Sequence, residues 1–105
     1  MSRSVASSDV FHAVAERNRR LILDTLRDGE QSVGSLVEAT GLSYSLTSQH
    51  LQVLLEAQTV LRQPEGRRRI YRLNAAPLRL VREWAAEYEQ FWQERLARLR
   101  RHLDQ

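Results

Sequence analysis

The sequence predicts a mainly helical domain in which four short helices are followed by a β-hairpin and one long helix, the order α-α-α-α-β-β-α. The segment 32–55 has apolar residues at helical spacing on both sides of Gly41, as expected for two helices joined by a tight turn. The segment 60–73 has two strand-like runs around Pro64-Glu65-Gly66, and arginines follow this turn. A helix-turn-helix with a basic hairpin behind it is a winged helix-turn-helix, which suits the DNA major groove.

Length and composition limit the class of protein. The 105 residues suffice for a single domain over 1–105 with a modest core, which we divide into a winged-helix core (8–74) and a dimerisation helix (75–105). The contents of 42% hydrophobic and 28% charged residues are those of a folded globular protein. Cysteine is absent from the sequence, which excludes disulfides and thiolate metal sites. The sequence has neither a signal-peptide pattern nor an apolar run of membrane-spanning length, so we expect a cytoplasmic location.

The net charge of +3 is distributed unevenly along the chain. Residues 58–74 hold five arginines and one glutamate, whereas residues 1–57 hold five arginines and seven acidic residues. The positive charge is therefore concentrated in the predicted hairpin, as a nucleic-acid-binding surface requires.

Each of the four short helices has its own start signal. We expect Asp9, Asn18, Ser32 and Ser43 to be the N-caps, because their short polar side chains can accept hydrogen bonds from the first free amides. Gly41 is expected to supply the positive φ of the turn between the third and fourth helices. The apolar residues expected to face the core are Val10, Phe11 and Val14, then Leu21, Ile22, Leu23 and Leu26, then Val33, Leu36 and Val37, then Leu46, Leu51, Leu54 and Leu55.

The hairpin and the last helix complete the prediction. Strands are expected over 60–63 and 67–73, with Tyr71 and Leu73 on one face, and a single helix from about Pro77 to about Leu103. The apolar stripe of this helix is longer than so small a domain can cover, so we expect a homodimer in which a second copy hides it. The predicted dimer interface consists of Val10, Phe11, Val81, Tyr88, Trp92, Leu96 and Leu99.

Uncharged polar side chains lie between the leucines of the fourth helix. Serine, threonine and glutamine can bond phosphates or base edges, and a solvated face would usually carry Glu or Arg, which are missing here before Glu56. Wing arginines can clamp phosphates or enter the minor groove; the alternative is protection of an exposed strand edge by charge. The predicted DNA-binding residues are Tyr44, Ser45, Thr47, Ser48, Gln49, His50, Gln52, Arg67, Arg68 and Arg69.

The aromatic residues of the last helix, the histidines and the carboxylates are the remaining candidates for ligand binding, metal binding and catalysis. The last helix carries the aromatic set Trp84, Tyr88, Phe91 and Trp92, which we interpret as dimer core, with a small-molecule pocket between subunits as the alternative. The three histidines are too scattered in the sequence for a metal site, so we expect no metal or other cofactor. A nucleophile–base pair, a glycine-rich phosphate loop and a paired-carboxylate cleft are all missing from the sequence, so we do not expect an enzyme.

The chain from Val10 to Leu73 resembles the ArsR/SmtB family of bacterial winged-helix repressors. The most specific segments are Ala15-Glu16 with Arg19-Arg20-Leu21-Ile22-Leu23, Ser48-Gln49-His50-Leu51 with Leu54, and Gly66-Arg67-Arg68-Arg69-Ile70-Tyr71. The resemblance implies a homodimer that binds a palindromic operator and represses, often at its own operon. It also implies DNA contacts by Ser45, Ser48, Gln49 and His50 on the recognition helix and by Arg67, Arg68 and Arg69 at the wing tip.

Several positions depart from the family pattern. Where the metal sensors have Cys-x-Cys in the third helix, this chain has Leu36-Val37-Glu38, and the Asp-x-His pattern of the last helix is replaced by Arg82-Glu83-Trp84. The chain thus resembles the metal-independent members with aromatic last helices, and this resemblance implies regulation by another ligand, by a partner protein or through the amount of protein. The family's Ala-Gly-Leu-Val after the recognition helix is Ala57-Gln58-Thr59-Val60 here, so we expect this turn to be rebuilt without glycine.

Two functional hypotheses follow. The first is a sequence-specific, homodimeric DNA-binding repressor without enzymatic activity or membrane contact, with its own gene among the candidate targets. The second is a winged-helix module that binds another protein and no specific DNA. The uncharged face of the fourth helix and the arginine wing favour the first, because a protein-binding module would more often expose an apolar patch there.

Overall fold

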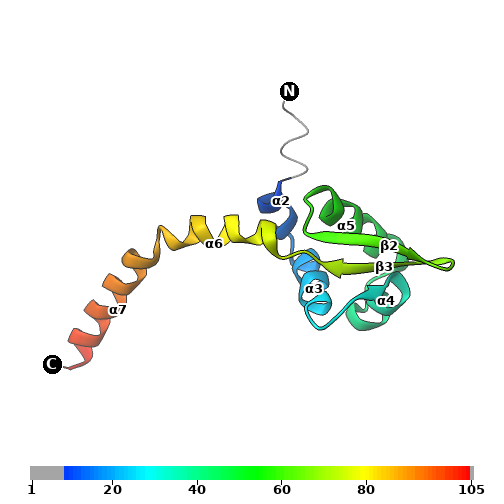
Figure 1. Ribbon diagram of the computed structural model, residues 1–105. Coiled ribbons are helices and arrows are strands. Elements are labelled where there is room, and N and C mark those ends of the chain that lie inside the picture. The colour runs from blue at the N-terminus through cyan, green and yellow to red at the C-terminus, as the bar shows by residue number, and fades with distance from the viewer. Residues whose placement is uncertain (1–8, 105) are drawn as a thin grey trace.

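The computed structural model describes residues 9–104 and shows a compact body from which the last two helices extend (Figure 1). The order is that of a winged helix-turn-helix, with α4 and α5 as the helix-turn-helix and β2 and β3 as the wing, and the predicted fold class is confirmed. The elements are α2 (Val10–Val14), α3 (Arg17–Leu26), β1 (Gln31–Ser32), α4 (Val33–Thr40), α5 (Tyr44–Glu56), β2 (Val60–Glu65), β3 (Arg68–Leu73), the 3₁₀ turn η1 (Ala76–Leu78), α6 (Arg79–Ala86) and α7 (Glu89–Leu103).

Side-chain caps determine where α2, α4 and α5 begin. Asp9, Ser32 and Ser43 each accept a hydrogen bond from a backbone amide in the first turn of the helix that follows, as predicted. Gly41 ends α4 with a φ of 75°, and its amide donates to the Val37 carbonyl oxygen. These local bonds fix the tight turn that joins α4 to α5.

Helix α3 begins differently from the prediction. Its N-cap is Glu16, whose Oε1 accepts hydrogen bonds from the amides of Asn18 at 2.7 Å and Arg19 at 3.0 Å. The prediction that Asn18 caps this helix is wrong. The helix begins one residue earlier, at Arg17, because the Glu16 side chain accepts from the amides of the first turn, and Asn18 therefore lies inside the helix.

A small antiparallel sheet supports the wing, in the strand order β1-β3-β2. The hairpin pairs Val60 with Leu73 at its base and Glu65 with Arg68 at its tip, so the first strand extends two residues further toward the turn than predicted, while the second begins one residue later. Strand β1 was not predicted: two residues are too few to show an alternating pattern, and Ser32 pairs with Ile70 while it also caps α4.

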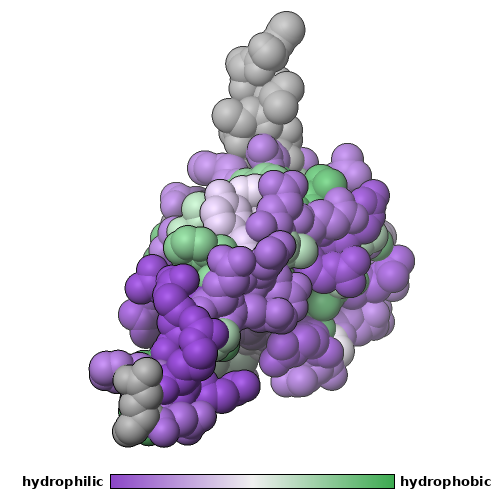
Figure 2. Space-filling view, turned by 90° about the vertical axis from the view of Figure 1, so that its left-hand side faces the viewer, coloured by the Kyte–Doolittle hydropathy of each residue, from purple (hydrophilic) through white to green (hydrophobic). Residues whose placement is uncertain are grey.

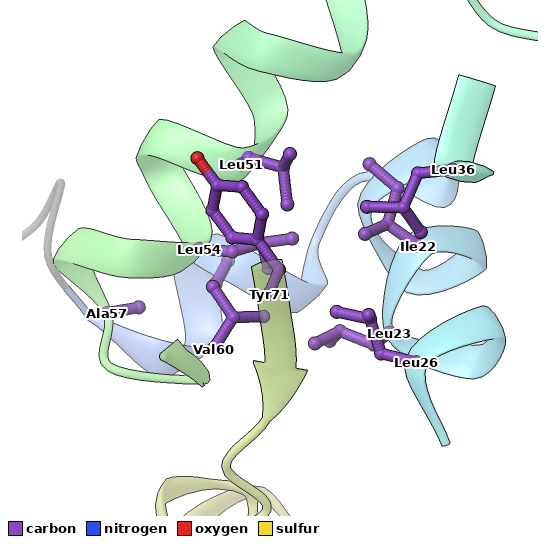
Figure 3. Packing of buried hydrophobic residues seen from close by; sticks show 10 residues of the cluster. Ile22, Leu23, Leu26, Leu36, Leu51, Leu54, Ala57, Val60 and Tyr71 are labelled. Carbon is purple, nitrogen blue, oxygen red and sulfur yellow. The ribbon is translucent and has the colours of Figure 1, made fainter. Parts of the chain in front are cut away.

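The core lies between α3, α5 and the sheet. Figure 3 shows Tyr71 projecting from β3 between the α5 leucines and the residues of α3. Leu21 and Phe11, which were predicted to be inward, are exposed, because α3 and α2 bury their opposite faces. The buried cluster consists of Ala13, Ile22, Leu23, Leu26, Leu36, Leu51, Leu54, Ala57, Val60 and Tyr71.

The predicted long C-terminal helix is broken. Helix α6 ends at Ala86, the Glu87 and Tyr88 amides close 3₁₀-type bonds to the carbonyls of Trp84 and Ala85, and α7 then starts at Glu89. Figure 1 shows α6 and α7 at an angle, with the C-terminal end far from the wing. Neither helix contains a buried residue. Among the described residues, no helix is long and apolar enough to cross a membrane.

Candidate nucleic-acid interface

A groove of about 560 Å³ separates the exposed face of α5 from the wing. The start of α4 forms its floor, with Ser32, Val33 and Gly34. The other lining residues are Tyr44, Ser48 and Gln52 from α5 and Arg62, Arg67, Arg68, Arg69 and Tyr71 from the hairpin. One wall therefore carries neutral polar side chains and the other carries arginines.

The wing arginines differ in their partners. Arg68 Nη2 donates to Glu65 Oε1 at 3.0 Å across the turn, and both side chains are exposed. Within residues 9–104, Arg67 and Arg69 form no ion pair, so their full positive charge faces solvent. The strongest positive potential of the hairpin is thus expected at these two residues.

The exposed face of α5 contains most of the residues predicted from the sequence. Tyr44, Ser45, Ser48, Gln49 and Gln52 are all exposed. Neutral hydroxyl and amide groups of this kind can donate to or accept from base edges. Their placement suits DNA contact, which stays a prediction for each residue.

Two of the predicted DNA contacts lie on the opposite face of α5. Thr47 is 0% exposed and its hydroxyl donates to the Ser43 carbonyl oxygen at 2.8 Å, while His50 is 9% exposed. Positions 47, 50, 51 and 54 share one face of an α-helix, and Leu51 and Leu54 face the core. This spacing could have placed Thr47 and His50 in the interior from the sequence alone.

A buried arginine that the sequence analysis did not single out lies behind α5. Arg19 is 8% exposed. Its Nε donates to the Ala13 carbonyl oxygen and its Nη2 to the His12 carbonyl oxygen, both at 2.9 Å. Its Nη1 lies 3.4 Å from His50 Nδ1. Arg19 thus joins the end of α2 to α5, a long-range contact that leaves no periodic signal in the sequence.

The half-buried Glu16 lies next to Arg19 and His50. Its Oε1 lies 3.8 Å from His50 Nε2. Partial burial raises the pKa of the Glu16 carboxyl, but hydrogen bonds from the backbone amides of Arg19 and Asn18 and electrostatic interactions with the His50 ring and the Arg19 guanidinium lower it by more, so the pKa lies below its ordinary value. The carboxylate form is therefore favoured at the start of α3.

Away from the groove, aromatic side chains form a ladder from α2 to α7. Phe11 and Trp84 meet edge to face at 5.9 Å, Trp84 and Tyr88 at 5.5 Å, and Tyr88 stacks on Trp92 at 6.4 Å between ring centroids. All four rings are exposed, and Leu96, Leu99 and Leu103 continue the apolar surface along α7. Figure 2 views the molecule from the side of α7 and shows a largely hydrophilic surface with separate hydrophobic patches.

Val10 does not belong to this exposed surface. It is 4% exposed within its own chain, because it lies on the inner face of α2. The prediction of Val10 as an interface residue is therefore corrected to a core position, whereas Phe11 and the other predicted interface residues keep free surface.

Within residues 9–104, no group of three or more histidine, aspartate or glutamate side chains is placed so that it could hold a metal ion. The three histidines lie on α2, α5 and α7.

Comparison with known proteins identifies the family. Residues 16–60 match the family described as "Bacterial regulatory protein, arsR family". The HTH-type transcriptional regulator Rv2034 of Mycobacterium tuberculosis is 34% identical over 92 residues, which cover 88% of this chain and 83% of the relative. The transcriptional repressor SdpR of Bacillus subtilis is 30% identical, over 77% of this chain and 90% of the relative.

A solved structure agrees with these relatives. The homodimeric winged helix-turn-helix DNA-binding domain Mb0332 of Mycobacterium bovis, a fragment described as a possible ArsR-family regulator, superposes with a TM-score of 0.65. It is 31% identical in sequence, over 83% of this chain and 82% of that domain. The chain belongs to the ArsR family of winged helix-turn-helix, DNA-binding transcriptional regulators.

Proposed function

We propose that this protein is a homodimeric repressor that binds a palindromic operator, with α5 in the major groove and the wing along the DNA backbone. The observation that carries the proposal is the groove between the neutral polar face of α5 and the arginines of the hairpin. One wall offers hydrogen-bonding groups that distinguish bases, and the other offers charge that binds any phosphate. The naming of SdpR as a repressor supports the direction of regulation.

The roles divide between the two walls. Ser45, Ser48 and Gln49 are the proposed base contacts, since they are exposed in the first two turns of α5. Tyr44, Gln52 and the three wing arginines are the proposed backbone contacts. Thr47 and His50 are left out of the contact set because they are buried.

The dimer is proposed to form through residues 75–105 together with Phe11. Tyr88, Trp92, Leu96 and Leu99 are exposed, and together with the half-buried Val81 they offer more apolar surface than a monomer of this size usually leaves uncovered. The homodimeric state of Mb0332 supports this proposal. A two-fold axis would then present two copies of α5 to half-sites about one helical turn apart.

Catalysis is no part of the proposal. The relatives are transcriptional regulators, which is a non-enzymatic class. We propose that an effector of the repressor is either a small molecule or a partner protein. A small molecule would bind at the aromatic ladder, which starts at Phe11 and Trp84, away from the groove.

Binding to the DNA upstream of the coding region tests the function. We expect footprinting to protect two half-sites of an imperfect palindrome, and sedimentation to show a dimer at low micromolar concentration. The alternative, a module that binds another protein, would give equal affinity for this DNA and a scrambled duplex at every salt concentration.

A further inference from the structure

Arg19 uses its three guanidinium nitrogens on two different helices. Nε and Nη2 bind the carbonyl oxygens of Ala13 and His12, in the last turn of α2, and Nη1 faces His50 of α5. Carbonyl groups at a helix end have no partner within the helix, and a basic side chain can satisfy them. Arg19 therefore holds the end of α2 and the middle of α5 at a fixed separation.

The chemistry of this contact selects one state of the histidine ring. A guanidinium group can only donate, so His50 Nδ1, at 3.4 Å from Nη1, has to accept. In the neutral ring the hydrogen then lies on Nε2, which faces Glu16 Oε1 at 3.8 Å. Both ring nitrogens are thus oriented by groups of α3 and its N-cap, and the ring cannot turn over without losing both contacts.

The orientation of this ring matters for the opposite face of the same helix. Ser48 and Gln49 directly precede His50 and are exposed, whereas His50 and Leu51 point inward. A rotation of α5 about its own axis would move the amide of Gln49 sideways. Contacts that discriminate between bases need placement within about 0.5 Å and 10–20°. A contact that stops this rotation therefore acts on sequence discrimination.

We propose that Arg19 is a positioning residue for operator recognition, which fixes the rotation of α5 by holding His50 in its neutral Nε2–H form. The inference rests on the proposed function, because it explains how the base-contacting face is kept in place. Arg19 touches no DNA in this scheme. The connection continues outward, since α2 also carries Phe11, which packs on Trp84 at the start of the aromatic ladder.

Two variants of His50 separate hydrogen bonding to Arg19 from apolar packing. In His50→Asn the amide oxygen can still accept from Arg19 close to the position of Nδ1, whereas His50→Leu keeps apolar volume and accepts nothing. We expect His50→Leu to lower operator affinity about tenfold, equal to about 1.4 kcal/mol, with affinity for scrambled DNA unchanged. His50→Asn should stay within about threefold of the wild type, a difference of about 0.7 kcal/mol. His12→Leu is the control, because it removes an exposed histidine ring and leaves the backbone acceptor of Arg19 intact.

A spectroscopic measurement tests the contact directly in the wild-type protein. The ¹⁵N shifts of the His50 ring should report a protonated Nε2 and an unprotonated Nδ1 near neutral pH, and Arg19→Gln should abolish this preference. The Nδ1–H tautomer in the wild type would overturn the proposal. So would equal losses of operator affinity in His50→Asn and His50→Leu, or no loss in His50→Leu.

The proposed function can fail separately. If the wild type does not distinguish the operator from scrambled DNA, repression through this groove is wrong even though the ring has the Nε2–H form. If the wild type does distinguish them and His50→Leu, His50→Asn and His12→Leu bind the operator equally well, only the role of Arg19 is wrong.

Discussion

Gln58 lies just after α5 and has a φ of 61°. Residues other than glycine adopt this left-handed backbone conformation only at a cost in free energy. The turn was expected to be rebuilt without glycine, but it keeps the left-handed residue. Neighbouring hydrogen bonds hold it in place: Asn74 Nδ2 donates to the Gln58 carbonyl oxygen at 2.7 Å, and the Thr59 hydroxyl donates to the Leu54 carbonyl oxygen at 2.9 Å.

Replacing this residue should stabilise the protein. Gln58→Gly relieves a strain of about 1–2 kcal/mol and adds about 0.5–1 kcal/mol of backbone entropy cost, so we expect a net gain of about 0.5–1 kcal/mol. Urea unfolding measures the change. Gln52→Gly, within α5, is the matched control and should lose about 1 kcal/mol. A loss of stability in both variants would show that the side chain of Gln58 contributes more than its backbone strain costs.

Glu16 makes the stability depend on pH. Its pKa in the folded chain lies below the ordinary value of 4.5, so its contribution is fully present above about pH 4.5 and is lost as the pH falls through the folded pKa. Glu16→Gln should therefore be less stable than the wild type at pH 6, and the difference should shrink towards pH 3. Thermal unfolding over this range checks it, with Glu38→Gln as an exposed carboxylate that caps no helix. A difference that grows towards pH 3 would contradict the direction of the shift.

At the scale of elements, α5 and the wing should contribute to DNA binding in different ways. Gln49→Ala removes a proposed base contact and should cost about 1–3 kcal/mol per half-site on the operator, with little change on scrambled DNA. Arg67→Ala removes a charge that has no ion-pair partner among the described residues, so it should weaken binding to both duplexes and reduce the salt slope by about one ion per subunit.

Anisotropy titrations of both duplexes at several salt concentrations measure these effects. Arg68→Ala is the comparison within the wing: because Glu65 already pairs with Arg68, this substitution should weaken binding to both duplexes less than Arg67→Ala does. An equal loss on both duplexes for Gln49→Ala would show that α5 does not discriminate bases through this residue.

Helix α7 should act in assembly and not in folding. Trp92 is 50% exposed in the single chain, so Trp92→Ala should leave the unfolding of a monomer almost unchanged but cost the dimer a few kcal/mol, about 3 by analogy with buried aromatics. Sedimentation equilibrium at low micromolar concentration should then show monomers. Gln93→Ala, its polar neighbour, should remain dimeric. If Trp92→Ala remains dimeric at this concentration, the aromatic ladder is not part of the dimer interface.

At the scale of the whole molecule, the proposed two-fold symmetry should make operator affinity depend on the spacing between the two half-sites. Inserting five base pairs between the half-sites turns one of them by about half a helical turn of roughly 10 base pairs, so a rigid dimer should lose its high affinity. Inserting ten base pairs restores the facing but separates the half-sites by about 34 Å more, and should recover affinity only if α6 and α7 can extend. Unchanged affinity in the five-base-pair variant would mean that each chain binds alone.

The sequence predicts the winged helix-turn-helix because its signals are local. Asp9, Ser32 and Ser43 cap the helices that follow them, and Gly41 turns the chain, all within a few residues. Features set by distant partners were missed or misplaced. His50 is buried by Arg19, 31 positions away, and strand β1 exists because Ile70 and Tyr71 are beside it. The break between α6 and α7 could not be predicted, because the sequence around it contains no glycine or proline.

Because α7 contains no buried residue, selection for a stable fold and selection for the proposed dimer contacts act on different residues of this short chain. Substitutions along its apolar strip leave the core around Tyr71 untouched, since no residue of that core comes from α7. In the proposed dimer, related regulators in one cell could therefore diverge in α7 until they no longer form mixed dimers, while the proposed DNA contacts of α5 and the wing stay unchanged. The same separation makes α7 the segment to exchange when two such regulators are to be paired by design.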